Sequence, residues 1–143
     1  MSNIWYSAWF VTDPEKLKKD FPPKHAKVFA HHSTIAFKPE SDAGLEVGKQ
    51  VTIKVLGRAS DDKDDALLVE NPKSKNEFPH ITLSCSPETD PIYSNELLKK
   101  AAAENTIEYF AEPYFVEAIE GYETLDREVV PSIAAPFNHT PGN

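Results

Sequence analysis

Short segments rich in β-branched and aromatic residues recur along this chain of 143 residues, and only two stretches have a helical pattern. Residues 4–11 read as a strand, and residues 49–59 alternate Val, Ile and Val with polar residues, which is typical of a half-buried strand. Further strands are predicted at residues 26–37, 66–70, 78–85 and, in one or two pieces broken near Pro113, 106–125. Because six or seven strands and two helices do not alternate strictly, we expect an α+β domain on a mainly antiparallel sheet.

The two predicted helices have recognisable ends. Thr12 or Asp13 can cap the first, Pro14 suits its first position, and Pro22-Pro23 ends it. The second covers residues 90–105, with competing cap candidates at Asp90, Ser94 and Asn95. Residues 129–143 are rich in proline and are predicted to form an irregular tail. No linker divides the chain, so a single domain over residues 1–143 is expected.

Charge and composition limit the possible partners. The net charge of −8 divides into +3 for residues 1–58 and −11 for the remainder. Proteins that grip a long nucleic acid need a broad basic face, so a short or cyclic nucleotide suits this chain better. The N-terminal apolar run is too short to span a bilayer, and the single cysteine, Cys85, fits a reducing compartment. We therefore expect a cytoplasmic protein with no membrane partner; the sequence does not indicate its oligomeric state.

Two strands carry the same motif. His32-Ser33-Thr34-Ile35 and His80-Ile81-Thr82-Leu83 both read His, any residue, Thr, aliphatic, and they begin 48 residues apart. Side chains alternate along a strand, so His and Thr of each motif project from one face. The same alternation places Ser84 with His80 and Thr82, and it places Ile35, Phe37, Ile81, Leu83 and Cys85 on the other face.

Facing pairs of this kind would suit chemistry at phosphorus. Two imidazoles can serve as general base and general acid near neutral pH, one on each side of the reacting centre. The hydroxyls of Thr34 and Thr82 can bind phosphoryl oxygens. This arrangement requires no metal and no cofactor.

The pair "HSTI" and "HITL" resembles the twin motif of the 2H phosphoesterase superfamily. That superfamily includes LigT-like RNA 2',3'-cyclic phosphodiesterases, the phosphodiesterase module of fungal tRNA ligases, and phage nucleases that cut cyclic oligonucleotides. The resemblance implies two pseudo-symmetric lobes of mainly antiparallel sheet, with helices outside and a cleft between them. It further implies that His32 and His80 are the catalytic acid and base and that Thr34 and Thr82 bind phosphate. The implied substrate is a small nucleotide or RNA end, most simply a 2',3'-cyclic phosphate.

Several alternatives stand beside this hypothesis. The chain could hydrolyse 3',5' linkages in cyclic oligonucleotides, bind nucleotides without turnover, or be a structural domain with coincidental motifs. Cys85 reads as a small core residue rather than a nucleophile, and a metal site built from His31, His32, His80 and Cys85 is disfavoured because adjacent strand residues point apart. Possible further substrate contacts are Tyr6, Ser84 and Tyr93.

The doubled histidine leaves a choice of register. His31 with Ser33 is also a His-x-hydroxyl pair, but only His32-x-Thr34-Ile35 aligns with the second motif. His31 is therefore predicted to be a packed or hydrogen-bonded neighbour of the catalytic residue.

Overall fold

The computed structural model describes residues 3–131, and within them eight strands form one antiparallel sheet accompanied by two helices. The elements in chain order are β1 (Ile4–Val11), α1 (Pro14–Asp20), β2 (Lys27–Val28), β3 (His32–Phe37), β4 (Gln50–Ser60), β5 (Asp64–Glu70), β6 (His80–Cys85), α2 (Tyr93–Glu104), β7 (Glu108–Thr124) and β8 (Val129–Val130). The strand order is β2-β6-β5-β4-β7-β1-β3, and β8 pairs with β7. No helix in this part of the chain is long and apolar enough to cross a membrane.

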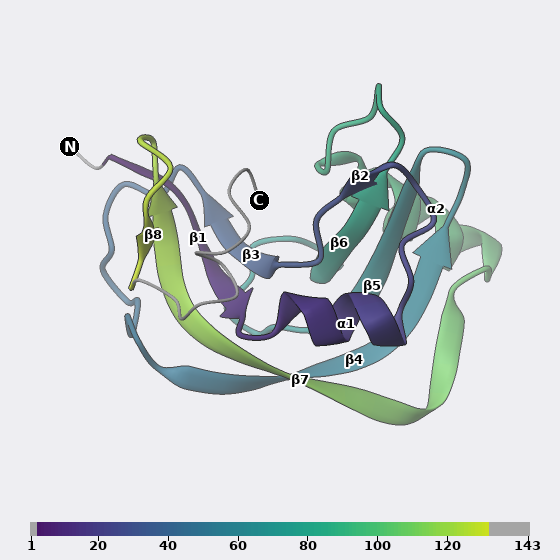
Figure 1. Cartoon of the computed structure of the whole chain (residues 1–143), viewed down its shortest axis with the longest axis horizontal. Coiled ribbons are helices and arrows are strands. Elements are labelled where there is room, and N and C mark those ends of the chain that lie inside the picture. The colour runs from purple at the N-terminus through teal and green to yellow at the C-terminus, as the bar shows by residue number, and fades with distance from the viewer. Residues whose placement is uncertain (1–2, 132–143) are drawn as a thin grey trace.

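The sheet is bent into two sides that share their longest strands. Figure 1 shows β1, β3 and β8 on one side and β2, β5 and β6 on the other, while β4 and β7 pass beneath both. β4 has 11 residues and β7 has 17, so each is long enough to serve both sides. The hydrogen-bond ladder therefore continues from one side to the other.

The predicted fold class was wrong. We expected an α+β domain of two lobes with helices outside, and the structure is instead dominated by one continuous antiparallel sheet. Because β4 and β7 run through both sides, no boundary separates two lobes. The helices have only 7 and 12 residues, and α1 contributes Leu17 to the core between the two sides rather than covering an outer face.

Most of the predicted elements are present with modest changes. β1 has the predicted bounds, and α1 is capped by Asp13, whose side chain accepts a hydrogen bond from the backbone N–H of Lys16. None of the three cap candidates caps α2, whose N-cap residue is Ile92, without a side-chain bond. β7 is continuous, but its pairing with β4 is irregular around Pro113, as expected for a residue that cannot donate to the ladder. Residues 129–130 of the predicted tail form β8, and residues 132–143 lie outside the described part.

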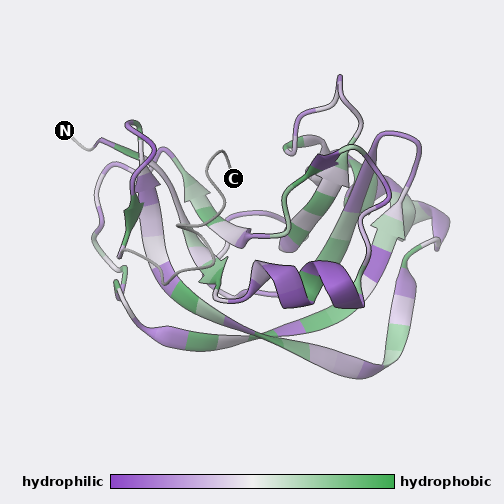
Figure 2. Cartoon of the chain, in the orientation of Figure 1, coloured by the Kyte–Doolittle hydropathy of each residue, from purple (hydrophilic) through white to green (hydrophobic). Residues whose placement is uncertain are grey.

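A main core lies between the two sides of the sheet. Figure 2 shows hydrophobic and hydrophilic residues alternating along the long strands, and a largely hydrophilic α1. The buried residues of the main core are Trp9, Val11, Leu17, Ala30, Ile35, Ile53, Val55, Leu67, Val69, Ile81, Leu83, Val116 and Ala118. A second cluster packs α2 against β4 and β5 through Ala59, Ala66, Leu68, Leu97, Leu98, Ala101 and Ile107.

One buried carboxylate joins three segments at the base of the main core. Glu120 of β7 is only 1% exposed; its Oε1 accepts a bond from Trp9 Nε1 at 2.9 Å, and its Oε2 accepts one from the backbone N–H of Glu46 at 2.7 Å. Lys73 completes the site with an ion pair at 2.5 Å. These bonds offset the cost of burying the charge, and together they hold the pKa of Glu120 below its usual value although burial opposes this.

We predict that Glu120→Ala lowers the free energy of unfolding by roughly 3 kcal/mol, because the buried indole N–H of Trp9 loses its acceptor and Lys73 loses its ion-pair partner. Urea unfolding followed by far-UV circular dichroism measures this difference. The control is Glu117→Ala on the same strand, where the side chain is exposed and the expected loss is below about 1 kcal/mol. Equal losses in the two variants would contradict the role given to Glu120.

Candidate functional site

The predicted strand 26–37 is divided between the two sides of the sheet. Its first part, β2, pairs with β6, and its second part, β3, pairs with β1. The change occurs at Ala30, which has a left-handed φ of 62°, and the carbonyl of His31 then accepts a bond from the backbone N–H of Val11 at 2.9 Å. This one segment therefore supplies both edge strands of the sheet, β2 and β3, and connects them.

The division brings the two motif histidines together. β2 pairs Lys27 with Cys85 and Val28 with Ser84, and backbone bonds from Phe29 to Leu83 and from Ala30 to Thr82 continue the ladder. Continued for two more residues, the same register would place His32 opposite His80; at that point the segment has left β6, and His32 pairs instead with Phe10 of β1. β3 also lies against β6, and a charge on His80 lowers the pKa of His32, so the two imidazoles share one electrostatic environment.

His80 is held by the backbone just before its own strand. Its Nδ1 lies 2.8 Å from the carbonyl oxygen of Phe78, so Nδ1 carries the proton and donates it. Burial lowers the pKa of His80, and this hydrogen bond partly opposes the shift. Nε2 has no hydrogen-bond partner among residues 3–131.

His32 is held by rings on two sides. It stacks on Tyr6 at 4.7 Å between centroids and on His31 at 4.6 Å, and Phe10 lies 5.9 Å away. The Nδ1 atoms of His31 and His32 are 2.6 Å apart, so one of them donates to the other. Burial lowers the pKa of His32 well below its ordinary value, and charges on His31 and His80 lower it further. The structure thus confirms His31 as a hydrogen-bonded neighbour.

The two motif threonines differ in their surroundings. The hydroxyl of Thr34 is half-buried and has no hydrogen-bond partner within the described residues. Thr82 is only 9% exposed, and its Oγ1 lies 2.8 Å from Oγ of Ser94 in α2. Ser94 in turn donates to the carboxylate of Asp64, at 2.9 Å from Oδ2 and 3.1 Å from Oδ1. Only Thr34 is therefore ready to donate a hydrogen bond to a ligand.

Each motif is followed at once by an irregularity in pairing. Opposite β1, Thr34 and Ala36 face consecutive residues, so Ile35 is an extra residue; opposite β5, Thr82 and Ser84 do the same, with Leu83 extra. Such a bulge reverses the alternation of the residues that follow it. Phe37 and Cys85 thus come onto the face of the histidines and threonines, which we call the motif face. Their predicted placement on the opposite face was wrong.

The bulge in β6 also removes Ser84 from the motif face. Its Oγ donates to Asp65 at 3.2 Å and accepts bonds from the backbone N–H groups of Lys24 and His25. Asp65 is fully buried and forms an ion pair with Arg58 at 2.8 Å. Ser84 therefore anchors the loop between α1 and β2, and it does not share a face with Thr82 as the alternation had predicted.

Tyr6 reaches His32 but not the surface. The ring is 7% exposed, and its hydroxyl donates to Oε1 of Glu123 at 2.5 Å. Burial and the neighbouring carboxylate both raise the pKa of Tyr6, so the phenol keeps its proton. In this structure Tyr6 supports the imidazole of His32 rather than presenting a face to a ligand.

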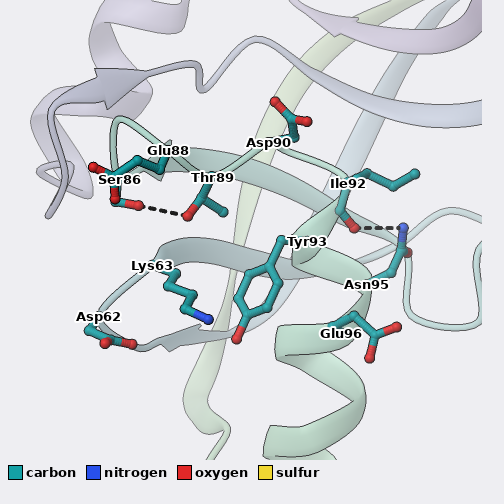
Figure 3. A pocket seen from close by; sticks show the side chains of 10 residues that line it. All are labelled: Asp62, Lys63, Ser86, Glu88, Thr89, Asp90, Ile92, Tyr93, Asn95 and Glu96. Atoms are coloured by element: carbon teal, nitrogen blue, oxygen red, sulfur yellow. Dashed lines mark hydrogen bonds between the residues drawn. The ribbon is translucent and has the colours of Figure 1, made fainter.

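Tyr93 lines a pocket that contains none of the four motif residues. The pocket, of about 890 Å³, lies between the β5 turn and the start of α2 and is lined by Asp62, Lys63, Ser86, Glu88, Thr89, Asp90, Ile92, Tyr93, Asn95 and Glu96. Figure 3 shows the Tyr93 ring in its centre, with carboxylates around it. The Tyr93 hydroxyl donates to Asp61 at 2.7 Å, and this bond is the main cause that raises its pKa to about 12.

Cys85 and the proposed metal ligands do not converge. Cys85 is buried with a free thiol, and burial, aided by the charge and hydrogen bond of Asp64, raises its pKa to about 12. Within residues 3–131, no group of three or more His, Cys, Asp or Glu side chains is arranged to hold a metal ion.

Three residues of this region were not found from the sequence. The sequence predicts Ser94 only as a possible helix cap, and it does not mark Asp64 as a site residue. Phe37 was assigned to the core, yet it is 64% exposed beside the motif, with Lys38 Nζ 5.5 Å from its ring. A bulge leaves no clear signature in a strand sequence, so the motif alone could not have revealed Phe37. No family model matches the chain, and no curated protein shows significant similarity to it.

The buried histidines predict loss of stability in acid. The pKa of His31 falls to about 4 because of burial and, secondarily, the charge of Lys18; the pKa values of His32 and His80 are also lowered. Below about pH 6.5 these histidines therefore bind more protons in the unfolded chain than in the folded chain. The free energy of unfolding falls as the pH drops through this range. His31 alone contributes roughly 3 kcal/mol of this loss by about pH 4. Burial raises the pKa of Asp64 to about 6, so this one group stabilises the folded state in acid. The three histidines with lowered pKa values outweigh it.

We expect wild type to be clearly less stable to urea at about pH 5 than at about pH 7.5, and His31→Gln to lose less over the same interval. Glutamine can keep the hydrogen bond to His32 without gaining a proton. An identical pH dependence in both proteins would contradict the assignment.

Proposed function

We propose that this chain is a metal-independent phosphodiesterase that opens a cyclic phosphate on a small nucleotide or RNA end, most simply a 2',3'-cyclic phosphate. The observation that carries the proposal is that β3 lies against β6 and that the charge of His80 acts on His32, while each histidine has a threonine two residues further along its strand. Either histidine has one ring nitrogen bound within the protein and one without a partner among the described residues. That is the arrangement needed to place an acid and a base on opposite sides of one phosphorus atom.

The surroundings of the histidines suggest their roles. His32, whose pKa lies well below 6.5, is neutral at pH 7 and suits the general base. Its Nε2 would take a proton from water while the water oxygen bonds to phosphorus. The carbonyl of Phe78 partly offsets the burial that lowers the pKa of His80, so His80 is the more easily protonated of the two histidines and suits the general acid. Once protonated, it would deliver a proton to the ribose oxygen as the P–O bond breaks, and Thr34 and Thr82 would hold phosphoryl oxygens.

Charge and composition favour a small substrate. The absence of a broad excess of Lys and Arg, with −8 overall, favours a short or cyclic nucleotide over a long strand. The single thiol is buried and free, which fits a reducing environment, so we place the protein in the cytoplasm.

We predict that His32→Ala and His80→Ala each lower kcat for 2',3'-cyclic nucleotides by at least about 10²-fold, because each removes one proton-transfer group. Product formation is followed by chromatography with and without EDTA, which is expected to have no effect. The control is His25→Ala, a histidine outside both motifs whose ring bonds to the carbonyl of Asp61. Full activity in either motif variant, or loss with EDTA, would contradict the proposal.

A substrate panel defines the class of bond that is broken. We expect 2',3'-cyclic nucleotides to be converted faster than cyclic di- and trinucleotides with 3',5' linkages. The reverse order would assign the chain to cyclic oligonucleotide hydrolysis. Saturable binding without product after prolonged incubation would make it a nucleotide-binding module instead.

A further inference from the structure

A chain of three polar side chains leads from the second motif into the protein. Thr82 contacts Ser94, the second residue of α2, and Ser94 contacts both carboxylate oxygens of Asp64 at the start of β5. Thr82 is 9% exposed, whereas Ser94 and Asp64 are fully buried. The chain therefore connects the surface of the candidate site to an interior carboxylate.

Counting protons fixes the direction of these hydrogen bonds. A serine hydroxyl has one proton, and an ionised carboxylate can only accept. While Asp64 is ionised, Ser94 donates to it, and Thr82 must then donate to Ser94. In that state Thr82 offers only lone pairs to a ligand and repels a phosphoryl oxygen. Once Asp64 holds a proton, both links can reverse: Asp64 donates to Ser94 and Ser94 donates to Thr82, which frees the Thr82 hydroxyl to donate to the ligand.

Fold stability does not explain Asp64. The carboxylate is fully buried and forms no ion pair with any residue between 3 and 131, while its neighbour Asp65 takes the guanidinium of Arg58. Burying a charge without a cation is costly, and such groups are found preferentially at functional sites. The only described donors to Asp64 are Ser94, the backbone N–H of Asp65 and the thiol of Cys85.

We propose that Asp64 and Ser94 are positioning residues that control whether the Thr82 hydroxyl can donate to a bound oxyanion. This inference rests on the proposed function, because it assigns Thr82 to the phosphate. Binding of the anion takes up one proton at Asp64, and no other atoms are exchanged. The ligand class is a phosphoryl group or another tetrahedral oxyanion.

The groups around Asp64 favour its neutral form. Burial and, to a smaller extent, the charges of Asp61 and Asp65 raise its pKa to about 6 against the opposing hydrogen bonds from Ser94 and the Asp65 backbone. The titratable and charged groups near it are Asp61, Asp65, Cys85 and Tyr93, with Lys27 and Asp90 acting on Cys85. A phosphoryl dianion or monoanion beside Thr82 adds to this negative field and favours protonation of Asp64 at neutral pH.

The test uses sulfate, whose charge is constant across the range, bound to the full-length protein and followed by calorimetry between about pH 5 and about pH 8. We expect the Kd of wild type for sulfate to rise about tenfold for each pH unit above about 6 because of Asp64. Any pH dependence that comes from the histidines adds to this rise. In Asp64→Asn the amide can donate to Ser94 at every pH. The dependence of log Kd on pH should therefore be shallower by one proton, and at about pH 8 this variant should bind sulfate more tightly than wild type does. Ser94→Ala should flatten the slope in the same way.

The control is Thr34→Val, because Thr34 has no polar side-chain partner within residues 3–131. Its Kd should rise at every pH while the slope of wild type is kept. Circular dichroism confirms that each variant is folded. An unchanged slope in both Asp64→Asn and Ser94→Ala, or no sulfate binding by wild type at any pH, would overturn the inference. Normal proton-linked binding without any turnover of cyclic phosphates would instead overturn the proposed function alone.

Discussion

The backbone pairing of residues 27–37 determines where the candidate site lies. In its first half this segment bonds to β6, and in its second half it bonds to β1, so it joins the ends of the sheet. Ala30 makes this possible by adopting a left-handed conformation that residues with a side chain seldom occupy. Because the change of partner comes two residues before His32, this histidine pairs with Phe10 of β1 while β3 still lies against β6.

The bulges that follow the two motifs give each one a similar local form. In both, an aliphatic residue enters the main core, one residue is added, and the next residue returns to the motif face. The outcomes differ because the neighbours differ. After the first motif the returning residue is Phe37, which meets solvent; after the second it is Cys85, whose thiol meets Asp64. The two halves of the site thus have equivalent backbones and different environments.

The sequence predicted the local elements better than their assembly. Strand alternation and proline positions located β1, α1 and β6 well, because these signals act over a few residues. The continuous sheet was missed, since nothing local reveals that β4 and β7 serve both sides. The motif residues were found because their spacing repeats, whereas Asp64 and Ser94 were not, because they meet Thr82 only through tertiary packing. Ser84 was misplaced by a single added residue.

The electrostatics of the site follow from its burial. Neutral imidazoles and hydroxyls can lie in a region with little solvent, such as that around the motif histidines. A lysine or arginine in the same place would require a paired negative charge. In the proposed function, such a site would bind a phosphoryl group through directed hydrogen bonds rather than through net charge, which is compatible with an acidic chain. Additional phosphates along a nucleic-acid strand would then add little to the affinity. The negative charge of the buried Asp64 would oppose binding of any anion until Asp64 is protonated, so the burial that lowers the histidine pKa values would also link anion binding to proton uptake.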